Sequence, residues 1–160
     1  MKKPKTFFVR TYGCQMNELD SELMVGQLLK RGLKQVYNEK EGDVLLFNTC
    51  SIRDLAERQV MGKIGQLGRS KKKQIIGVTG CMAMAKKESL FKKLPNVDFV
   101  IGTNNITDLG MTLDHVIETG QKQLKTDDQF EENLRRSPAV RQPQPHGTQG
   151  QHRRHHRRQR

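Results

Sequence analysis

Apolar residues in the first hundred positions fall into four short runs that are typical of β-strands. The runs are near-continuous rather than alternating, as in residues 44–47 (Val-Leu-Leu-Phe), which predicts strands buried on both faces of a parallel sheet. Between and after these runs the apolar positions take on a helical period. The predicted strands are Thr6–Thr11, Asp43–Thr49, Gln74–Thr79 and Val97–Ile101.

Four segments carry the helical period, and the first of them illustrates the pattern. Leu19, Leu23, Leu28 and Leu29 are expected to form its apolar face, and Gly32 is expected to end it. The predicted helices are Glu18–Arg31, Asp54–Leu67, Ala83–Leu94 and Ile106–Glu118.

Strands that alternate with helices of this length form βαβ units with right-handed crossovers. We therefore predict an α/β fold: an open, doubly wound, mainly parallel sheet with helices on both faces. The segment Lys34–Gly42 is weakly patterned, although Gln35–Tyr37 could add an edge strand.

The apolar pattern fades after Leu124. Arg, Gln, Pro and His supply 20 of the last 28 residues, a composition that cannot bury enough surface to offset chain entropy. The expected organisation is a folded domain over residues 1–124 and a disordered tail over residues 125–160. The four dominant residue types of the tail can all be encoded by codons beginning with C, so we interpret the tail as a frame-shifted translation that truncates the chain.

The net charge of +12 is concentrated in this tail. Residues 1–132 hold 21 Lys and Arg against all 17 acidic residues, whereas residues 133–160 hold eight Arg and no acid. The folded part is therefore only mildly basic. No apolar run approaches the roughly 20 residues of a membrane span or the h-region of a secretory signal. The chain is expected to be cytoplasmic, with no membrane partner.

Three cysteines, Cys14, Cys50 and Cys81, are the only thiols in the chain. Their odd number and wide spacing argue against a disulfide framework. Each follows a predicted strand by one to three residues and precedes a predicted helix. Because parallel strands end at one edge of a sheet, the three thiols are expected to converge at the edge where α/β proteins bind ligands.

The neighbours of these cysteines suit a ligand site. Asn17 and Asp20 can cap the helix after Cys14, and Ser51 with Asp54 forms a capping signature after Cys50. Helix N-termini favour negative charge, as a bound thiolate carries. Small residues precede each sulfur, which we interpret as room for a bulky inorganic group.

Three thiolates match a four-iron four-sulfur cluster with one open iron better than structural zinc. Zinc needs four ligands, and no His lies near any of the cysteines in sequence. We therefore predict Cys14, Cys50 and Cys81 as metal ligands and assign no catalytic residue. The competing interpretation is that all three are buried cysteines acting as small hydrophobic residues.

Three motifs together resemble those of the radical-SAM methylthiotransferases. They are residues 11–17 (Thr-Tyr-Gly-Cys-Gln-Met-Asn), residues 48–53 (Asn-Thr-Cys-Ser-Ile-Arg) and residues 80–83 (Gly-Cys-Met-Ala), and the resemblance covers about residues 5–120. Gln-Met-Asn after the first cysteine and Ser-Ile-Arg after the second are similar to the tRNA-modifying branch of that family.

The resemblance implies formation of 2-methylthio-N6-isopentenyladenosine on tRNA, next to the anticodon. It also implies that the three cysteines hold an auxiliary 4Fe-4S cluster that supplies or carries the inserted sulfur. The full-length family has a second 4Fe-4S cluster, which cleaves S-adenosylmethionine, on a C-x-x-x-C-x-x-C motif in a central barrel. No cysteine follows Cys81 here, so we expect the chain to be inactive alone.

Other functions remain open at this point. The first is a stand-alone iron–sulfur or metal carrier that delivers its contents to another protein. A nucleotide-binding domain would fit the sheet type, but the chain lacks a G-x-G-x-x-G or Walker loop. The last is an RNA-binding protein that uses the Arg-rich tail, which has no interleaved aromatic residues.

Overall fold

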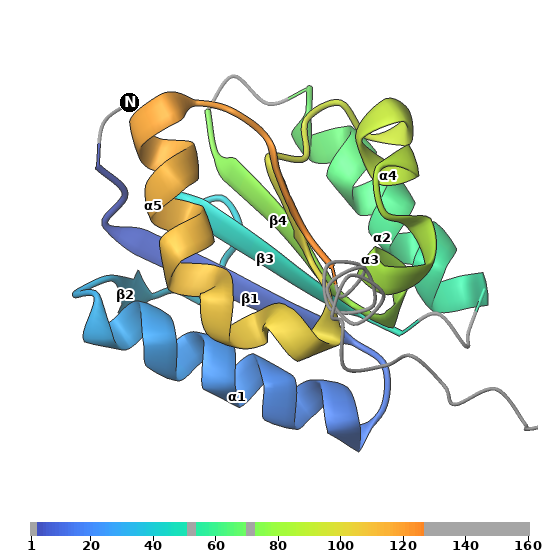
Figure 1. The fold of residues 1–160 in the computed structure, drawn as a ribbon, viewed down its shortest axis with the longest axis horizontal. Helices are drawn as coiled ribbons and strands as arrows, with labels where there is room; N and C mark the ends of the chain where they lie inside the picture. The colour runs from blue at the N-terminus through green and yellow to red at the C-terminus, as the bar shows by residue number, and fades with distance from the viewer. Residues whose placement is uncertain (1–2, 51–53, 70–72, 127–160) are drawn as a thin grey trace, which may run out of the picture.

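The computed structural model describes residues 3–50, 54–69 and 73–126, which form a six-stranded sheet with helices on both faces (Figure 1). All strand pairs are parallel, and the order across the sheet is β2-β1-β3-β4-β5-β6. The predicted α/β class and parallel sheet are confirmed. The strands are β1 (Thr6–Tyr12), β2 (Lys34–Gln35), β3 (Val44–Thr49), β4 (Ile75–Gly80), β5 (Phe99–Ile101) and β6 (Gln123–Lys125).

The helices divide between the two faces because each face of the sheet carries its own apolar core. One core joins the sheet to α1 (Gln15–Lys30), the 3-10 helix η1 (Thr103–Asp108) and α5 (Leu109–Thr119). The other joins it to α2 (Asp54–Leu67), α3 (Cys81–Lys86) and α4 (Ser89–Lys93), and Figure 1 shows the two groups on opposite sides. Successive residues of β3 supply the two cores alternately: Val44 and Leu46 face α1, whereas Leu45 and Phe47 face α2.

The strand order places a reversal of chain direction in the middle of the sheet. From β1 the chain passes over α1 to β2 on one side, whereas from β3 it passes over α2 to β4 on the other. The first five strands thus follow the 2-1-3-4-5 order of flavodoxin-like sheets, with the switch point between β1 and β3. The last crossover departs from the expected uniform hand. It runs from β5 to β6 over the α1 face, and it is therefore opposite in hand to the crossover from β3 to β4.

The predicted buried face of α1 is wrong. Leu19, Leu23 and Leu29 are at least half exposed, and of the four leucines only Leu28 is buried. The side chains that α1 buries are Asn17, Ser21, Met24 and Leu28. The helix is therefore rotated so that two polar side chains near its N-terminus reach the sheet.

Several boundaries also differ from the prediction. The expected single helix over 83–94 is divided into α3 and α4 at Lys87, whose φ of 44° lies outside the helical region. The edge strand β2 covers only Lys34–Gln35. Strand β6 was not predicted, and it ends one residue past the expected domain boundary at 124. The tail predicted for 125–160 lies, from residue 127 onward, outside the described residues.

No helix in the described part of the chain has the length and apolar character that a membrane crossing requires.

Gly77 in β4 tests the packing of the α1-side core. A Cβ built there would lie 2.2 Å from the ring of Phe99 and 2.9 Å from Leu46, so Gly77→Ala should lower the free energy of unfolding by about 1–3 kcal/mol. Gly65 lies on the exposed side of α2 with no atom within 4 Å of such a Cβ. Gly65→Ala is therefore the matched control, and it should raise the free energy of unfolding by about 0.5–1 kcal/mol. Urea unfolding of both variants measures these changes, and an unaffected Gly77→Ala protein would contradict this packing.

Candidate metal centre

The three cysteines follow the ends of three neighbouring strands. Strands β1, β3 and β4 are adjacent, and their register pairs Tyr12 with Thr49 and Thr49 with Gly80. Cys50 and Cys81 come one residue after their strands, and Cys14 comes two residues after β1. Since adjacent strands lie about 4.8 Å apart, residues 36 and 31 positions apart in sequence are brought to one edge of the sheet.

Cys14 and Cys50 lie on the two sides of the switch point between β1 and β3. In open α/β sheets the crevice for ligands lies beyond the carboxyl ends of the strands at such a point. The Cys50 amide donates a hydrogen bond to the Tyr12 carbonyl at 2.9 Å, which joins the two loops directly after the strands end. The cysteines therefore occupy the position where this fold class binds its ligands.

The three thiols differ in exposure. Cys50 is 4% exposed, Cys14 is exposed and Cys81 is intermediate. Cys14 is the N-cap residue of α1, and Cys81 is the first residue of α3. Cys14 and Cys81 are therefore accessible from solvent, whereas Cys50 is buried.

The glycines before two of the sulfurs are required by the protein itself. Gly80 has φ +91°, and a Cβ there would lie 2.2 Å from the Thr49 carbonyl oxygen. A Cβ on Gly13 would lie 2.4 Å from the Asn17 Oδ1 and 2.9 Å from the Cβ of Cys50. The space that the sequence suggested for an inorganic group is therefore filled, next to Gly13 and Gly80, by neighbouring protein atoms. Both glycines let the cysteine-bearing loops approach each other.

A buried polar network lies beneath the cysteines. Asn48, fully buried in β3, donates from its Nδ2 to the Asn17 carbonyl at 2.6 Å and to the Ser21 Oγ at 3.0 Å. Asn17 donates in return to the Asn48 Oδ1 at 3.1 Å, and the hydroxyls of Ser21 and Thr11 are 2.7 Å apart. The network fixes the N-terminal turns of α1 against β1 and β3.

This network reaches Cys14 through Asn17. The Cys14 amide donates to the Asn17 Oδ1 at 3.4 Å, and the Cys14 Sγ lies 3.5 Å from the same oxygen. Asn17 is the third residue of α1, and its side chain bonds back to Cys14, which is the N-cap residue. The prediction that Asn17 itself caps the helix is therefore wrong. The predicted Ser51–Asp54 capping pair depends on residues outside the described part of the chain, and α2 begins at Asp54.

The arrangement does not fit a single metal ion. Within residues 3–50, 54–69 and 73–126, no three His, Cys, Asp or Glu side chains are grouped as ligands of one ion. Zinc would hold thiolates about 3.8 Å apart, because each Zn–S bond is about 2.3 Å. The thiolates of a four-iron cluster bind different iron atoms, so they can stand at separate strand ends. Three thiols that follow three strand ends are the type of donor that iron–sulfur clusters use.

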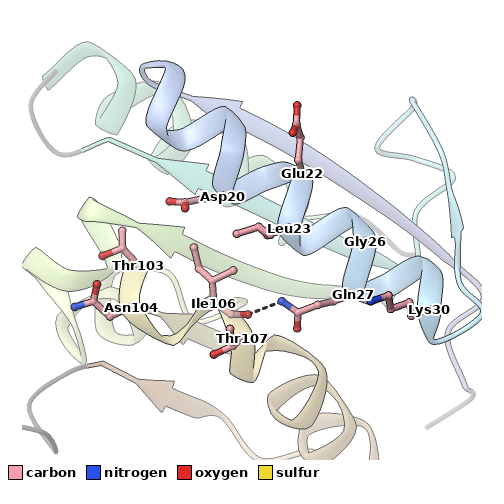
Figure 2. A pocket seen from close by; sticks show the side chains of 10 residues that line it. All are labelled: Asp20, Glu22, Leu23, Gly26, Gln27, Lys30, Thr103, Asn104, Ile106 and Thr107. Carbon is pink, nitrogen blue, oxygen red and sulfur yellow. Dashed lines mark hydrogen bonds between the residues drawn. The ribbon is translucent and has the colours of Figure 1, made fainter.

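A second concave region, which no sequence pattern predicted, lies between α1 and η1. This pocket has a volume of about 510 Å³. Gln27 on α1 donates to the Ile106 carbonyl on η1 at 2.9 Å, and Figure 2 shows the two residues among those that line the pocket. Asp20 lines this pocket on the α1 side, and Thr103 and Asn104 line it on the η1 side. Burial raises the pKa of the Asp20 carboxyl above its ordinary value. Asp20 therefore faces the pocket, rather than capping α1 as predicted.

Comparisons with known proteins identify the family to which the chain is similar. The Uncharacterized protein family UPF0004 matches residues 6–102, a range that contains all three. A tRNA-2-methylthio-N(6)-dimethylallyladenosine synthase from Protochlamydia amoebophila (strain UWE25) is 64% identical over 135 residues, which are 84% of this chain and 30% of that protein.

Proteins of the same name show lower identity in other bacteria. The one from Petrotoga mobilis is 44% identical over 107 residues, 65% of this chain and 24% of that protein. The one from Carboxydothermus hydrogenoformans is 36% identical over 147 residues, 86% of this chain and 33% of that protein. The chain thus spans about a third or less of the length of these relatives. Because the family match covers more than half of its residues, the chain belongs to the Uncharacterized protein family UPF0004.

Proposed function

We propose that this chain is the cluster-binding domain of a tRNA methylthiotransferase, with Cys14, Cys50 and Cys81 as ligands of one 4Fe-4S cluster. The observation that carries the proposal is the register of β1, β3 and β4, which brings the only three thiols to one edge of the sheet at its switch point. The names of the relatives support tRNA as the substrate class, since each is named as a tRNA-2-methylthio-N(6)-dimethylallyladenosine synthase.

The residues around the thiols have separate tasks in this proposal. Cys14 and Cys81, the two more accessible thiols, bind from the sides, and Cys50 binds from the buried floor. Asn17 and Asn48 hold the loop of Cys14 against β3, so the ligand does not have to order that loop when it binds. By the family resemblance, the cluster supplies or carries the sulfur that is inserted into the tRNA base.

Three thiolates leave one iron of such a cluster without a protein ligand, because four-iron clusters are usually held by four cysteines. In this proposal Cys14, the exposed thiol, would hold the cluster at the solvent side of the edge, and the iron without a protein ligand would supply an open coordination position. The sequence contains no further cysteine. The second cluster that the family resemblance implies, which cleaves S-adenosylmethionine, therefore cannot be held by thiols of these 160 residues.

Anaerobic reconstitution with iron and sulfide should load about four irons per chain and produce broad visible absorption. Cys14→Ala should abolish or strongly weaken that loading because it removes one of three ligands. The Cys14 side chain is exposed, so the fold should survive, and the urea midpoint of the apoprotein serves as the control.

Cys50→Ala and Cys81→Ala should lose the cluster as well. If the protein binds stoichiometric zinc and takes up no iron, or if Cys14→Ala loads as much iron as the unchanged chain, the proposed site is wrong.

The 160-residue chain alone should neither cleave S-adenosylmethionine nor methylthiolate tRNA. Radical generation needs a cofactor-chelating cluster in a shielded cavity, and the three thiols are already assigned. We expect no 5′-deoxyadenosine from the loaded chain under reducing conditions. The full-length Protochlamydia relative, assayed in parallel, is the positive control. Stoichiometric 5′-deoxyadenosine from the 160-residue chain would contradict the prediction.

A further inference from the structure

A polar groove of about 370 Å³ lies between β1 and α2, on the sheet face opposite α1. None of the described residues that line it is acidic. They are Arg10 and Tyr12 from β1 and Arg58, Gln59, Gly62, Lys63 and Gln66 from α2. The Lys63 ammonium bonds to Glu39 at 2.5 Å, so the positive character of the groove comes chiefly from the two arginines.

Strand β2 pairs with only the beginning of β1. Its two residues pair with Thr6 and Phe7, and in the described part of the chain no strand pairs with the rest of β1 on that side. Phe8 packs in the α2-side core, and side chains alternate along a strand, so Arg10 and Tyr12 project from the same face as Phe8. On the facing helix, Gly62 leaves open space, with no atom within 4 Å of a Cβ built there.

The groove ends beside the proposed cluster site. Tyr12, which lines the groove, accepts the Cys50 amide hydrogen bond at 2.9 Å and stands two residues before Cys14. A ligand that follows β1 toward its carboxyl end therefore arrives at the edge that carries the cysteines.

The groove joins the two kinds of group that recognise single-stranded RNA. Guanidinium groups match phosphate oxygens in a planar, two-point geometry, and aromatic rings stack on unpaired bases. Here the guanidinium of Arg10 lies over the Tyr12 ring, 5.5 Å from its centre, so a positive charge and an aromatic ring are neighbours in the groove. Gln59 and Gln66 add amide donors and acceptors for base edges. An acidic peptide would use the charges but gain nothing from the ring.

We propose that this groove binds a single-stranded segment of RNA, with Arg10 and Arg58 on phosphates and Tyr12 against a base, and directs it to the cysteine edge. The inference rests on the proposed function for the identity of the RNA as tRNA. It adds an RNA contact on this domain, separate from the Arg-rich residues after position 132.

The test uses the full 160-residue chain and a fluorescently labelled anticodon stem–loop RNA, with binding followed by anisotropy over a salt series. Arg10→Gln with Arg58→Gln should weaken binding about tenfold near 0.1 M salt and lower the slope of log K against log salt by about two. Both side chains are exposed, so the double variant should keep its fold. Lys92→Gln with Lys93→Gln removes the same charge from the exposed surface of α4 and should change the affinity less than twofold.

Tyr12 gives a second readout that charge alone would not change. Tyr12→Leu should weaken RNA binding several-fold at high salt, whereas Tyr12→Phe, which keeps the ring, should not. Urea unfolding of both variants checks the fold, because Tyr12 also packs against the α2-side core.

Three outcomes would overturn the inference. Equal losses in the two double variants would assign the binding to overall charge, and equal affinities of the two Tyr12 variants would remove the stacking contact. Arginine-dependent binding of polyglutamate, without arginine-dependent binding of RNA, would assign the groove to an acidic protein partner. Iron loading is measured on the same samples. If the chain binds no cluster but RNA binding still requires Arg10 and Arg58, the cluster proposal fails while the RNA proposal stands.

Discussion

The pairing of β3 with β1 on one side and β4 on the other is the constraint on which the candidate site depends. The six residues of β3 are all buried, and each pairs with a residue of β1 and a residue of β4. The three strands therefore end together at Tyr12, Thr49 and Gly80. A slip of one residue in either pairing would shift a cysteine by about 3.3 Å along the strand and would exchange the two cores, since side chains alternate between faces. The apolar packing of the sheet therefore also sets the positions of the thiols.

On the α1 face of the sheet, polar side chains are buried next to the candidate site where leucines would be expected. A helix packed on a sheet would ordinarily bury its leucines, yet α1 exposes Leu19 and Leu23 and buries Asn17 and Ser21. Burying such groups is costly unless they are hydrogen-bonded, and here the amide of Asn48 bonds to both residues. The bonded side chains give α1 one orientation, which places the N-cap Cys14 at the edge of the sheet.

The sequence predicted the parts of the fold that follow from local apolar patterns. Strands β1, β3 and β4 are continuous apolar runs, and α2 keeps a regular helical period, so their positions agree with the structure. The buried face of α1 could not be predicted, because Asn17 is stabilised by a residue 31 positions away. Strand β6 was missed for a similar reason: Gln123–Lys125 has little apolar character and forms a strand by pairing with β5.

The site shows the same division between local and long-range information. The convergence of Cys14, Cys50 and Cys81 at one edge followed from the strand ends alone, but the reason for the small residues before them did not. Gly80 adopts φ +91° so that its backbone can approach Thr49, and only the pairing of β3 with β4 makes that approach necessary. The groove beside Tyr12 likewise depends on long-range packing, because β1 and α2 line it together. Sequence alone therefore indicates which cysteines share one edge of the sheet, whereas the packing of strands and helices decides which side chains surround them.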